Sequence, residues 1–323
     1  MYLLKNRFVY AMLTAVLCLL LSSTSAYSTP TAADLLKIKW VHVPAKPPEG
    51  VQHGTFHSAC MDTAVGYNIY LPPSYDADSD RRFPVVYFLH GSAGNESRSI
   101  RLATYLHQAI LEKKVPEMIM VFANGGRNSG YIDAIDGTVM PETMIIKELI
   151  PHIDANYRTI GERSGRAIQG FSMGGVGSLR FAAKFPDLFS SVVVWGAGGV
   201  REFKSLPKAE EFDDVEKAKR KLPVRNVIMG NDLTYWQESN AWHLLEENRD
   251  RIVNRLPIRI VIGSEDPSRV GAKDTHNRLS ELKIAYEFEL IQGPDHNIYK
   301  LYDHSGLEGL RFHARNFGER DAE

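Results

Sequence analysis

The sequence predicts an α/β fold in which a mostly parallel central sheet is flanked by helices. Apolar runs of strand length recur along the chain, for example at 84–89 and 258–262, and such runs are typical of strands buried on both faces of a parallel sheet. Segments with helical periodicity, such as 97–114, separate them. This alternation favours a sheet wrapped by helices over a β-sandwich or a helix bundle.

Length and charge exclude several classes of protein. The chain has 323 residues, enough to bury a large core, and α/β folds of this size commonly form one domain. Its formal net charge is −1, with 44% hydrophobic and 24% charged residues. This balance provides no electrostatic footprint for nucleic acid and no sign of extensive disorder. We therefore expect a globular protein that does not bind nucleic acid.

The first residues predict export. Lys5 and Arg7 precede the apolar run 8–21, and the small residues 24–26 follow it. The run is shorter than the roughly 20 residues that a spanning helix needs, so we expect a signal peptide, 1–26, and no stable membrane span in the mature form. An uncleaved anchor is the alternative. The expected location is secreted or periplasmic, and the sequence does not indicate an oligomeric state.

Cysteine usage predicts neither a disulfide nor a metal site. Cys18 lies in the expected signal peptide, which leaves Cys60 alone and unable to form an intrachain bridge. We expect Cys60 to be a buried or half-buried small apolar residue. The chain has no CxxC pair and no HExxH helix, so we expect no metal.

The rest of the chain can be divided by composition. Residues 27–55 are rich in threonine, alanine, lysine and proline, which favours an N-terminal arm or linker over core. A charged segment between two late strands, about 200–256, predicts a small helical cap insertion over the site. The remaining expected strands are 65–71, 117–123, 166–169, 191–195 and 286–291, and further helices are expected at 143–157, kinked by Pro151, and from the serine turn to Phe185.

Residues 170–174 read Gly-Phe-Ser-Met-Gly at a turn between a strand and a helix. A GxSxG turn of this kind exposes its serine, and small residues at both ends let the backbone pass close to strand and helix. A serine hydroxyl also needs a base and donors for an oxyanion. We expect Ser172 to be the nucleophile and the Met173 N–H to be one donor. The alternative is an ordinary glycine-rich turn.

The second oxyanion donor is expected after the strand 84–89, where His-Gly-Ser-Ala-Gly follows at 90–94. Small residues at a strand end let backbone N–H groups point into a cavity, and the Ser92 N–H is the favoured donor. We expect His90 to be a packed histidine that shapes this loop, not a base.

Two late strands each end near a residue that completes the chemistry. Asp266 follows 258–262 and His296 follows 286–291, so serine, acid and histidine occur in the order typical of α/β hydrolases. Asp266 is expected to orient His296, and His296 to take the proton of Ser172. Glu265, Asp232 and Asp295 are alternatives for the acid, and His304 is an alternative for the base.

Substrate contacts are expected in two places. The polar loop 124–131 leaves a strand's carboxyl end, where ligands bind in open α/β sheets, so Tyr131, Asp133 and Arg127 are candidates. A solvated loop is the alternative. In the cap, Trp236, Trp242 and Tyr235 are candidates for an apolar acyl pocket, with ordinary helix packing as the alternative.

Several motifs together carry a family resemblance: residues 70–75, 87–91, 148–151 and 170–175, with the late Asp266 and His296. They cover roughly 56–302 and resemble the putative-esterase family of α/β-hydrolases, which includes esterase D, S-formylglutathione hydrolases, feruloyl esterases, enterochelin-type esterases and mycobacterial mycolyltransferases. The resemblance implies an α/β-hydrolase domain at 56–323, no cofactor, and catalysis by Ser172, Asp266 and His296.

These observations predict an exported serine carboxylic-ester hydrolase that works through an acyl-enzyme on a small-molecule or glycan-linked ester. Cytosolic S-formylglutathione hydrolases fit poorly, because this chain carries an export signal. An acyltransferase of the same fold is one alternative, and a catalytically inactive hydrolase-fold binding protein is another.

Overall fold

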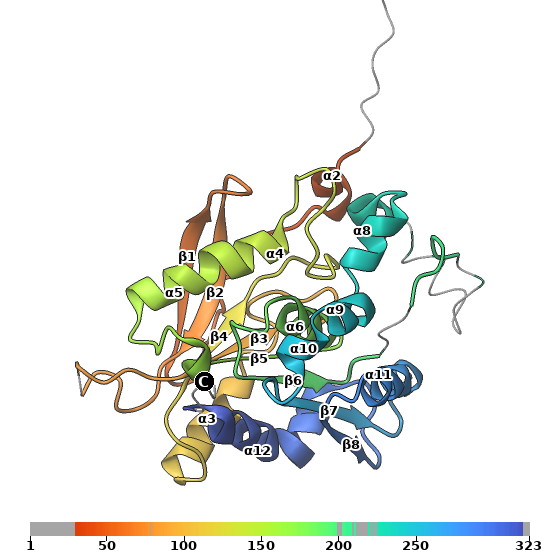
Figure 1. The fold of residues 1–323 in the computed structure, drawn as a ribbon. Coiled ribbons are helices and arrows are strands. Elements are labelled where there is room, and N and C mark those ends of the chain that lie inside the picture. Colours follow the sequence, from red (N-terminus) through yellow and green to blue (C-terminus); the bar gives the residue numbers. More distant parts are fainter. Residues whose placement is uncertain are drawn as a thin grey trace, which may run out of the picture. The chain divides into compact units, whose positions relative to one another are not determined.

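The computed structural model describes residues 30–77, 79–198, 202–208, 210, 219, 222 and 225–318 (Figure 1). Contacts divide the chain into two units, 1–31 and 32–323, and the elements described below belong to the second. The expected signal peptide, 1–26, lies outside the described residues. No helix in the described part of the chain is both long and apolar enough to cross a membrane.

Within the described residues, eight strands form one sheet in the order β1-β2-β4-β3-β5-β6-β7-β8. The first two pairings, β1 with β2 and β2 with β4, are antiparallel, and all the others are parallel. The predicted mostly parallel sheet is therefore confirmed. The strands are β1 (Val51–Ser58), β2 (Thr63–Tyr70), β3 (Val85–Leu89), β4 (Ile119–Ala123), β5 (Arg166–Phe171), β6 (Ser191–Trp195), β7 (Ile258–Gly263) and β8 (Glu287–Ile291).

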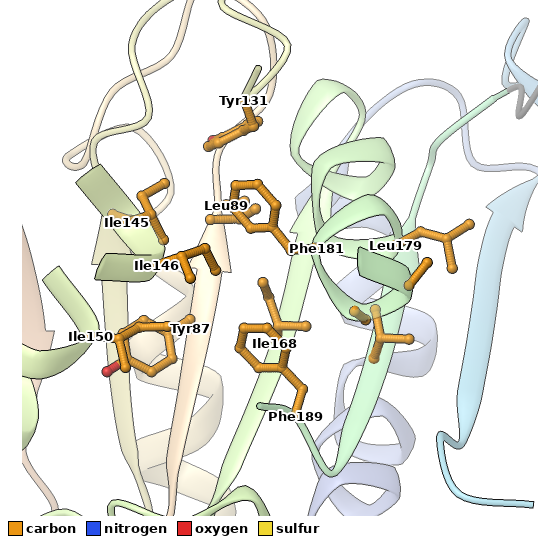
Figure 2. Close-up of a cluster of buried hydrophobic side chains, with 14 of the residues drawn as sticks. Tyr87, Leu89, Tyr131, Ile145, Ile146, Ile150, Ile168, Leu179, Phe181 and Phe189 are labelled. Atoms are coloured by element: carbon orange, nitrogen blue, oxygen red, sulfur yellow. The ribbon is translucent and has the colours of Figure 1, made fainter. Parts of the chain in front are cut away.

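Helices cover both faces of the sheet, because β3, β4 and β6 are buried at every position and alternate side chains point to opposite faces. On one face, Tyr87 and Leu89 pack with Phe181 (Figure 2). On the other, Val86 packs with Leu106. The helices are α2 (Ala32–Leu36), α3 (Leu102–Leu111), α4 (Pro141–Thr143), α5 (Ile150–Asn156), α6 (Met173–Lys184), α8 (Leu233–Glu238), α9 (Ala241–Glu247), α10 (Arg249–Ile252), α11 (Arg269–Glu281) and α12 (Ile298–Asn316).

The helix expected at 143–157 is not a regular α-helix. Residues Met144–Leu149 form a π-helix, and α5 begins directly after it with Pro151 in its first turn. Proline cannot donate a backbone hydrogen bond, which breaks the regular α-helical ladder at this point. The irregular segment thus ends just before Pro151, the residue at which the sequence predicts a kink.

Residues 32–55 belong to the second unit and contribute to its core, which corrects the prediction of an arm or linker for this part of 27–55. Ala32 and Leu36 of α2 are buried, and the sheet begins at Val51, earlier than the predicted first strand 65–71. The carbonyl of Trp40 accepts hydrogen bonds from Gly66 N (2.7 Å) and Asn124 Nδ2 (2.9 Å). We call residues 39–42 the strap. The prediction failed because β1 is an edge strand with many polar side chains and the strap attaches largely through its backbone.

One helix of the predicted cap packs beside α6, the helix that follows Ser172. In Figure 1, α9 lies close to α6, and the two helices are in contact, while α10 contacts α9. The Tyr235 hydroxyl donates to the Asp133 carbonyl at 2.5 Å. Residues 211–218 lie outside the described residues. That the insertion covers the site therefore stays a prediction.

Candidate active site

The structure brings together three residues that lie far apart in the sequence. Ser172 follows β5, Asp266 follows β7 and His296 follows β8, so all three lie at the carboxyl ends of parallel strands. The distance from Ser172 Oγ to His296 Nε2 is 2.9 Å, and His296 Nδ1 lies 2.8 Å from Asp266 Oδ2. A hydroxyl, an imidazole and a carboxylate are thus in hydrogen-bond contact in that order.

The turn around Ser172 has the strained backbone of a nucleophile elbow. Ser172 has φ 56° and ψ −116°, and its N–H donates to the Trp195 carbonyl at 2.9 Å. A Cβ atom on Gly170 would lie 2.2 Å from the Gly174 carbonyl oxygen, and one on Gly174 would lie 2.0 Å from the Leu89 carbonyl oxygen. Neither position can hold a side chain, as the motif predicted.

Two contacts orient the imidazole. Asp266 is fully buried, and its Oδ1 accepts from Ser268 N at 2.7 Å, which leaves Oδ2 facing His296. Because a carboxylate accepts, His296 Nδ1 donates to it and Nε2 presents a lone pair to the serine hydroxyl. The Phe171 ring packs on the imidazole, with centroids 4.7 Å apart. Sequence reasoning missed Phe171, since it is the variable residue of GxSxG.

The competing acids and the competing histidine lie elsewhere. Asp232 accepts from Thr234 N at 2.9 Å and caps α8, and Asp295 pairs with Lys300 at 3.1 Å. Glu265 and His304 are exposed. Geometry thus favours Asp266 and His296 over these alternatives.

Of the two residues expected to supply oxyanion donors, Met173 adjoins Ser172 in the chain, and Ser92 lies on a loop that approaches Ser172. Met173 is the first residue of α6 and directly follows the serine. A Cβ atom on Gly91 would lie 3.4 Å from Ser172 Cβ, so the loop after β3 lies against Ser172, and Ser92 is the next residue of that loop. Their action as donors stays a prediction.

His90 is a packed histidine, as predicted. Its Nε2 accepts from Gly125 N at 3.2 Å, and its Nδ1 lies 2.9 Å from the Gly91 carbonyl, to which it donates. Burial lowers the pKa of His90 to about 4, so the ring is neutral near pH 7. It fixes the backbone at the start of the loop that carries Ser92.

Tyr131 is not a substrate contact, which corrects the prediction for this residue. Its side chain is fully buried in the core shown in Figure 2, and its hydroxyl donates to the His90 carbonyl at 2.9 Å. Its ring fills space left by two glycines: a Cβ atom would lie 1.9 Å from the ring at Gly125 and 2.7 Å from it at Gly177. Tyr131 therefore supports the active-site loops from beneath.

Trp236 is also buried and does not line an open acyl pocket. It packs edge-on against Phe203, and its Nε1 donates to the Gly230 carbonyl at 3.1 Å. Asp133, another candidate, accepts from Glu142 N at 2.8 Å and so caps α4. Arg127 is exposed beside the site loops. A sequence cannot distinguish an aromatic ring that fills a core from one that lines a pocket, because both positions are apolar.

Metal and thiol chemistry find no support in the described residues. Among them, no group of three or more histidine, cysteine, aspartate or glutamate side chains could hold a metal ion. Cys60 is half-buried, and burial raises the pKa of its thiol. Its N–H donates to Glu148 at 2.8 Å, so this carboxylate anchors the turn between β1 and β2.

Solved structures with the same architecture define the class of fold. A ferulic acid esterase superposes with a TM-score of 0.67 at 25% sequence identity, covering 83% of this chain and 98% of that chain. An S-formylglutathione hydrolase from Agrobacterium tumefaciens superposes with a TM-score of 0.66 at 18% identity, covering 83% and 95%. The protein has an α/β-hydrolase fold.

A family model described as "Putative esterase" matches residues 58–306. The chain belongs to this family. Esterase Rv1288 of Mycobacterium tuberculosis is 37% identical over 139 residues, which is 42% of this chain and 30% of that protein. An endo-1,4-beta-xylanase/feruloyl esterase of Xylanibacter ruminicola is 30% identical over 175 residues, 50% of this chain and 24% of that protein. The matches span less than a third of these relatives.

Proposed function

We propose that the protein is an exported serine carboxylic-ester hydrolase. The observation that carries this proposal is the hydrogen-bonded series Ser172, His296 and Asp266 in a member of an esterase family. The strained elbow supports it, because strain of this kind persists where a function needs the exposed side chain. The expected signal peptide supports export.

In the acylation half of the reaction, Ser172 Oγ attacks the acyl carbonyl carbon while His296 Nε2 takes the hydroxyl proton. The carbonyl π electrons move onto oxygen, and the N–H groups of Met173 and Ser92 stabilise that oxyanion. Asp266 stabilises the imidazolium that forms. The bond to the alcohol then breaks, His296 returns its proton to the leaving alkoxide, and the acyl group remains on Ser172.

Deacylation repeats these steps with water. His296 Nε2 takes a proton from water, whose oxygen attacks the acyl carbonyl, and the same N–H groups stabilise the second oxyanion. The carboxylic acid leaves as the proton returns to Ser172. The side-chain Nε2 is accessible for this step, because the His296 side chain is 35% exposed.

The substrate is a small-molecule or glycan-linked ester. The names of two similar proteins, a feruloyl esterase joined to a xylanase and a ferulic acid esterase, support testing hydroxycinnamate esters beside aliphatic ones.

The test is turnover of a panel of 4-nitrophenyl esters of graded chain length and of methyl ferulate by the mature protein. We expect hydrolysis of at least one ester, and loss of about 10,000-fold or more in kcat for S172A, because the nucleophile is gone. S280A, at an exposed serine of α11, is the matched control and keeps its turnover. Acyl transfer to an added alcohol in preference to water would indicate the acyltransferase alternative. No turnover of any ester would favour the binding protein.

A further inference from the structure

The proposed mechanism leaves one buried carboxylate near the site without a function. Glu96 lies on the loop after β3 that also carries Ser92, and its side chain is fully buried. Its Oε1 accepts from the backbone N–H of His42, and its Oε2 lies 3.3 Å from His42 Nδ1. The Nε2 atom of His53 lies 3.8 Å from Oε1. The partners of Glu96 therefore come from the strap and from β1.

The space around this carboxylate is shaped to hold it. A Cβ atom on Gly66 of β2 would lie 2.4 Å from Glu96 Oε1, so a larger residue there would displace the carboxylate. Gly66 N in turn donates to the strap at the Trp40 carbonyl, and Asn68 Nδ2 donates to the Glu96 carbonyl at 3.1 Å. Strand β2 thus fixes both the strap and the backbone of Glu96.

A second contact ties the loop to the strap. Ser97 Oγ donates to the His42 carbonyl at 2.5 Å, one residue beyond Glu96. His42 is therefore bound to the loop through both its backbone N–H and its backbone carbonyl. A strap with free ends would not hold this geometry, but the Trp40 carbonyl anchors it to Gly66 and Asn124.

The part of the loop between the strap and the nucleophile is short and hydrogen-bonded. Gly94 N donates to the Gly91 carbonyl at 3.0 Å, which closes the turn that contains Ser92. Ala93 N donates to Asn128 Oδ1 at 3.2 Å. Asn95 alone separates this turn from Glu96. The position of the turn thus depends on His90 at one end and on Glu96 at the other.

We propose that Glu96 is a positioning residue, which holds the Ser92 N–H at the oxyanion by binding the loop to the N-terminal strap. The inference rests on the proposed function. If the inference holds, residues 39–42, which composition places in a linker, help to set the geometry of the active site. Glu96 itself touches neither substrate nor reacting atoms.

The decisive comparison is between E96L and E117L, assayed as kcat and KM on the best ester of the panel. Leucine has a similar size but no acceptor, so His42 N–H loses its partner. Glu117 is the matched control, because it also accepts from the backbone N–H and contacts the side chain of one residue, here Ser74, but it lies before the amino end of β4 and not at the carboxyl ends of the strands. The assay is run at pH 8, since burial raises the pKa of Glu96 to about 7 in the presence of His42, His53 and Lys39.

We expect E96L to lower kcat per folded molecule by about 10- to 100-fold with KM changed less than about twofold, because an oxyanion donor acts in the transition state and not in substrate binding. E117L should lose thermal stability but keep its kcat. E96Q, which retains one oxygen acceptor, should recover part of the lost kcat. Should E96L not fold, E96Q decides: a fall in kcat of threefold or more at unchanged KM supports the inference, and a smaller change overturns it.

Two outcomes would contradict the inference and spare the proposed function. One is E96L with the kcat of the wild type. The other is an equal fall in kcat in E96L and E117L, which would indicate a general loss of structure. By contrast, a wild-type protein without turnover, or an S172A variant that keeps it, would contradict the proposed function itself.

Discussion

Ser172 combines a backbone in an unusual conformation with a hydrogen-bond contact to His296. A side chain at φ 56° and ψ −116° costs of the order of 1 to 3 kcal/mol, and Ser172 holds this conformation because its N–H is bound to Trp195 and its flanking glycines fit against backbone. The strain directs Oγ to His296 at 2.9 Å. Local instability at Ser172 is thus offset by contacts of its neighbours.

Asp266→Asn tests the orienting function of the carboxylate. An amide can donate to His296 Nδ1, which favours the tautomer with a proton on Nε2, and Nε2 then cannot accept the Ser172 proton. We expect kcat to fall by about 1,000- to 10,000-fold with KM little changed. The measurement is steady-state hydrolysis of the best ester by folded protein, checked by circular dichroism.

Asp295→Asn is the matched control, because it makes the same chemical change one residue before the histidine. Asp295 is exposed and pairs with Lys300, so its loss should change kcat by less than about threefold. If the two variants behaved alike, the buried carboxylate would not be the orienting group.

At the scale of elements, the position of Ser172 depends on how β5, the turn after it and α6 pack against β3. The start of α6 lies so close to the carboxyl end of β3 that a methyl group does not fit between them. Gly174→Ala would place its Cβ 2.0 Å from the Leu89 carbonyl oxygen, and neither backbone can give way cheaply. We expect a loss of about 3 kcal/mol or more in the free energy of unfolding. A displaced elbow would also lower kcat by about 100-fold. Urea denaturation and turnover per folded molecule measure the two effects.

Gly161→Ala is the control for this change. Its Cβ would meet Asp154 no closer than 3.6 Å, and its backbone is not in the left-handed region, so stability and kcat should stay near those of the wild type. A Gly174→Ala variant as stable and active as Gly161→Ala would contradict the prediction. It would show that the backbone of the turn can move far enough to accommodate the added Cβ atom without loss of stability or activity.

Much of this arrangement was predictable, since carboxyl ends of parallel strands meet at one edge of a sheet. That rule, together with the chain order typical of α/β hydrolases, predicted that Ser172, Asp266 and His296 lie together. It failed for Tyr131, whose burial depends on Gly125 and Gly177, glycines that give no apolar signal. It could not identify the strap or Glu96 either, because those contacts form mainly through backbone groups of distant segments.

At the scale of the whole molecule, stability depends on buried groups that resist protonation. His313 of α12 is fully buried, its Nδ1 lies 2.8 Å from Ser191 Oγ of β6, and burial lowers its pKa to about 3. His90 behaves similarly, with a pKa of about 4. Below pH 6.5 the unfolded chain binds protons that the folded protein does not, so these two groups make stability fall as the pH falls. Glu96 has the opposite effect: its pKa is raised to about 7, so between pH 7 and 4.5 the folded protein binds a proton that the unfolded chain does not. The contribution of Glu96 to stability therefore rises as the pH falls through this range.

His313→Asn separates these opposing contributions. The variant keeps a side-chain amide near Ser191 but has no titrating ring, while His90 and Glu96 contribute equally to both proteins. We expect the variant to be less stable near pH 7, and its deficit to shrink by about 3 kcal/mol between pH 7 and 4.5, since each unit of pH below 6.5 removes about 1.4 kcal/mol from the wild type. Urea denaturation of both proteins at half-unit steps measures the difference. A constant deficit across that range would mean that His313 takes up its proton in the folded protein over the same pH range as in the unfolded chain, and that the contact between α12 and β6 tolerates a charge.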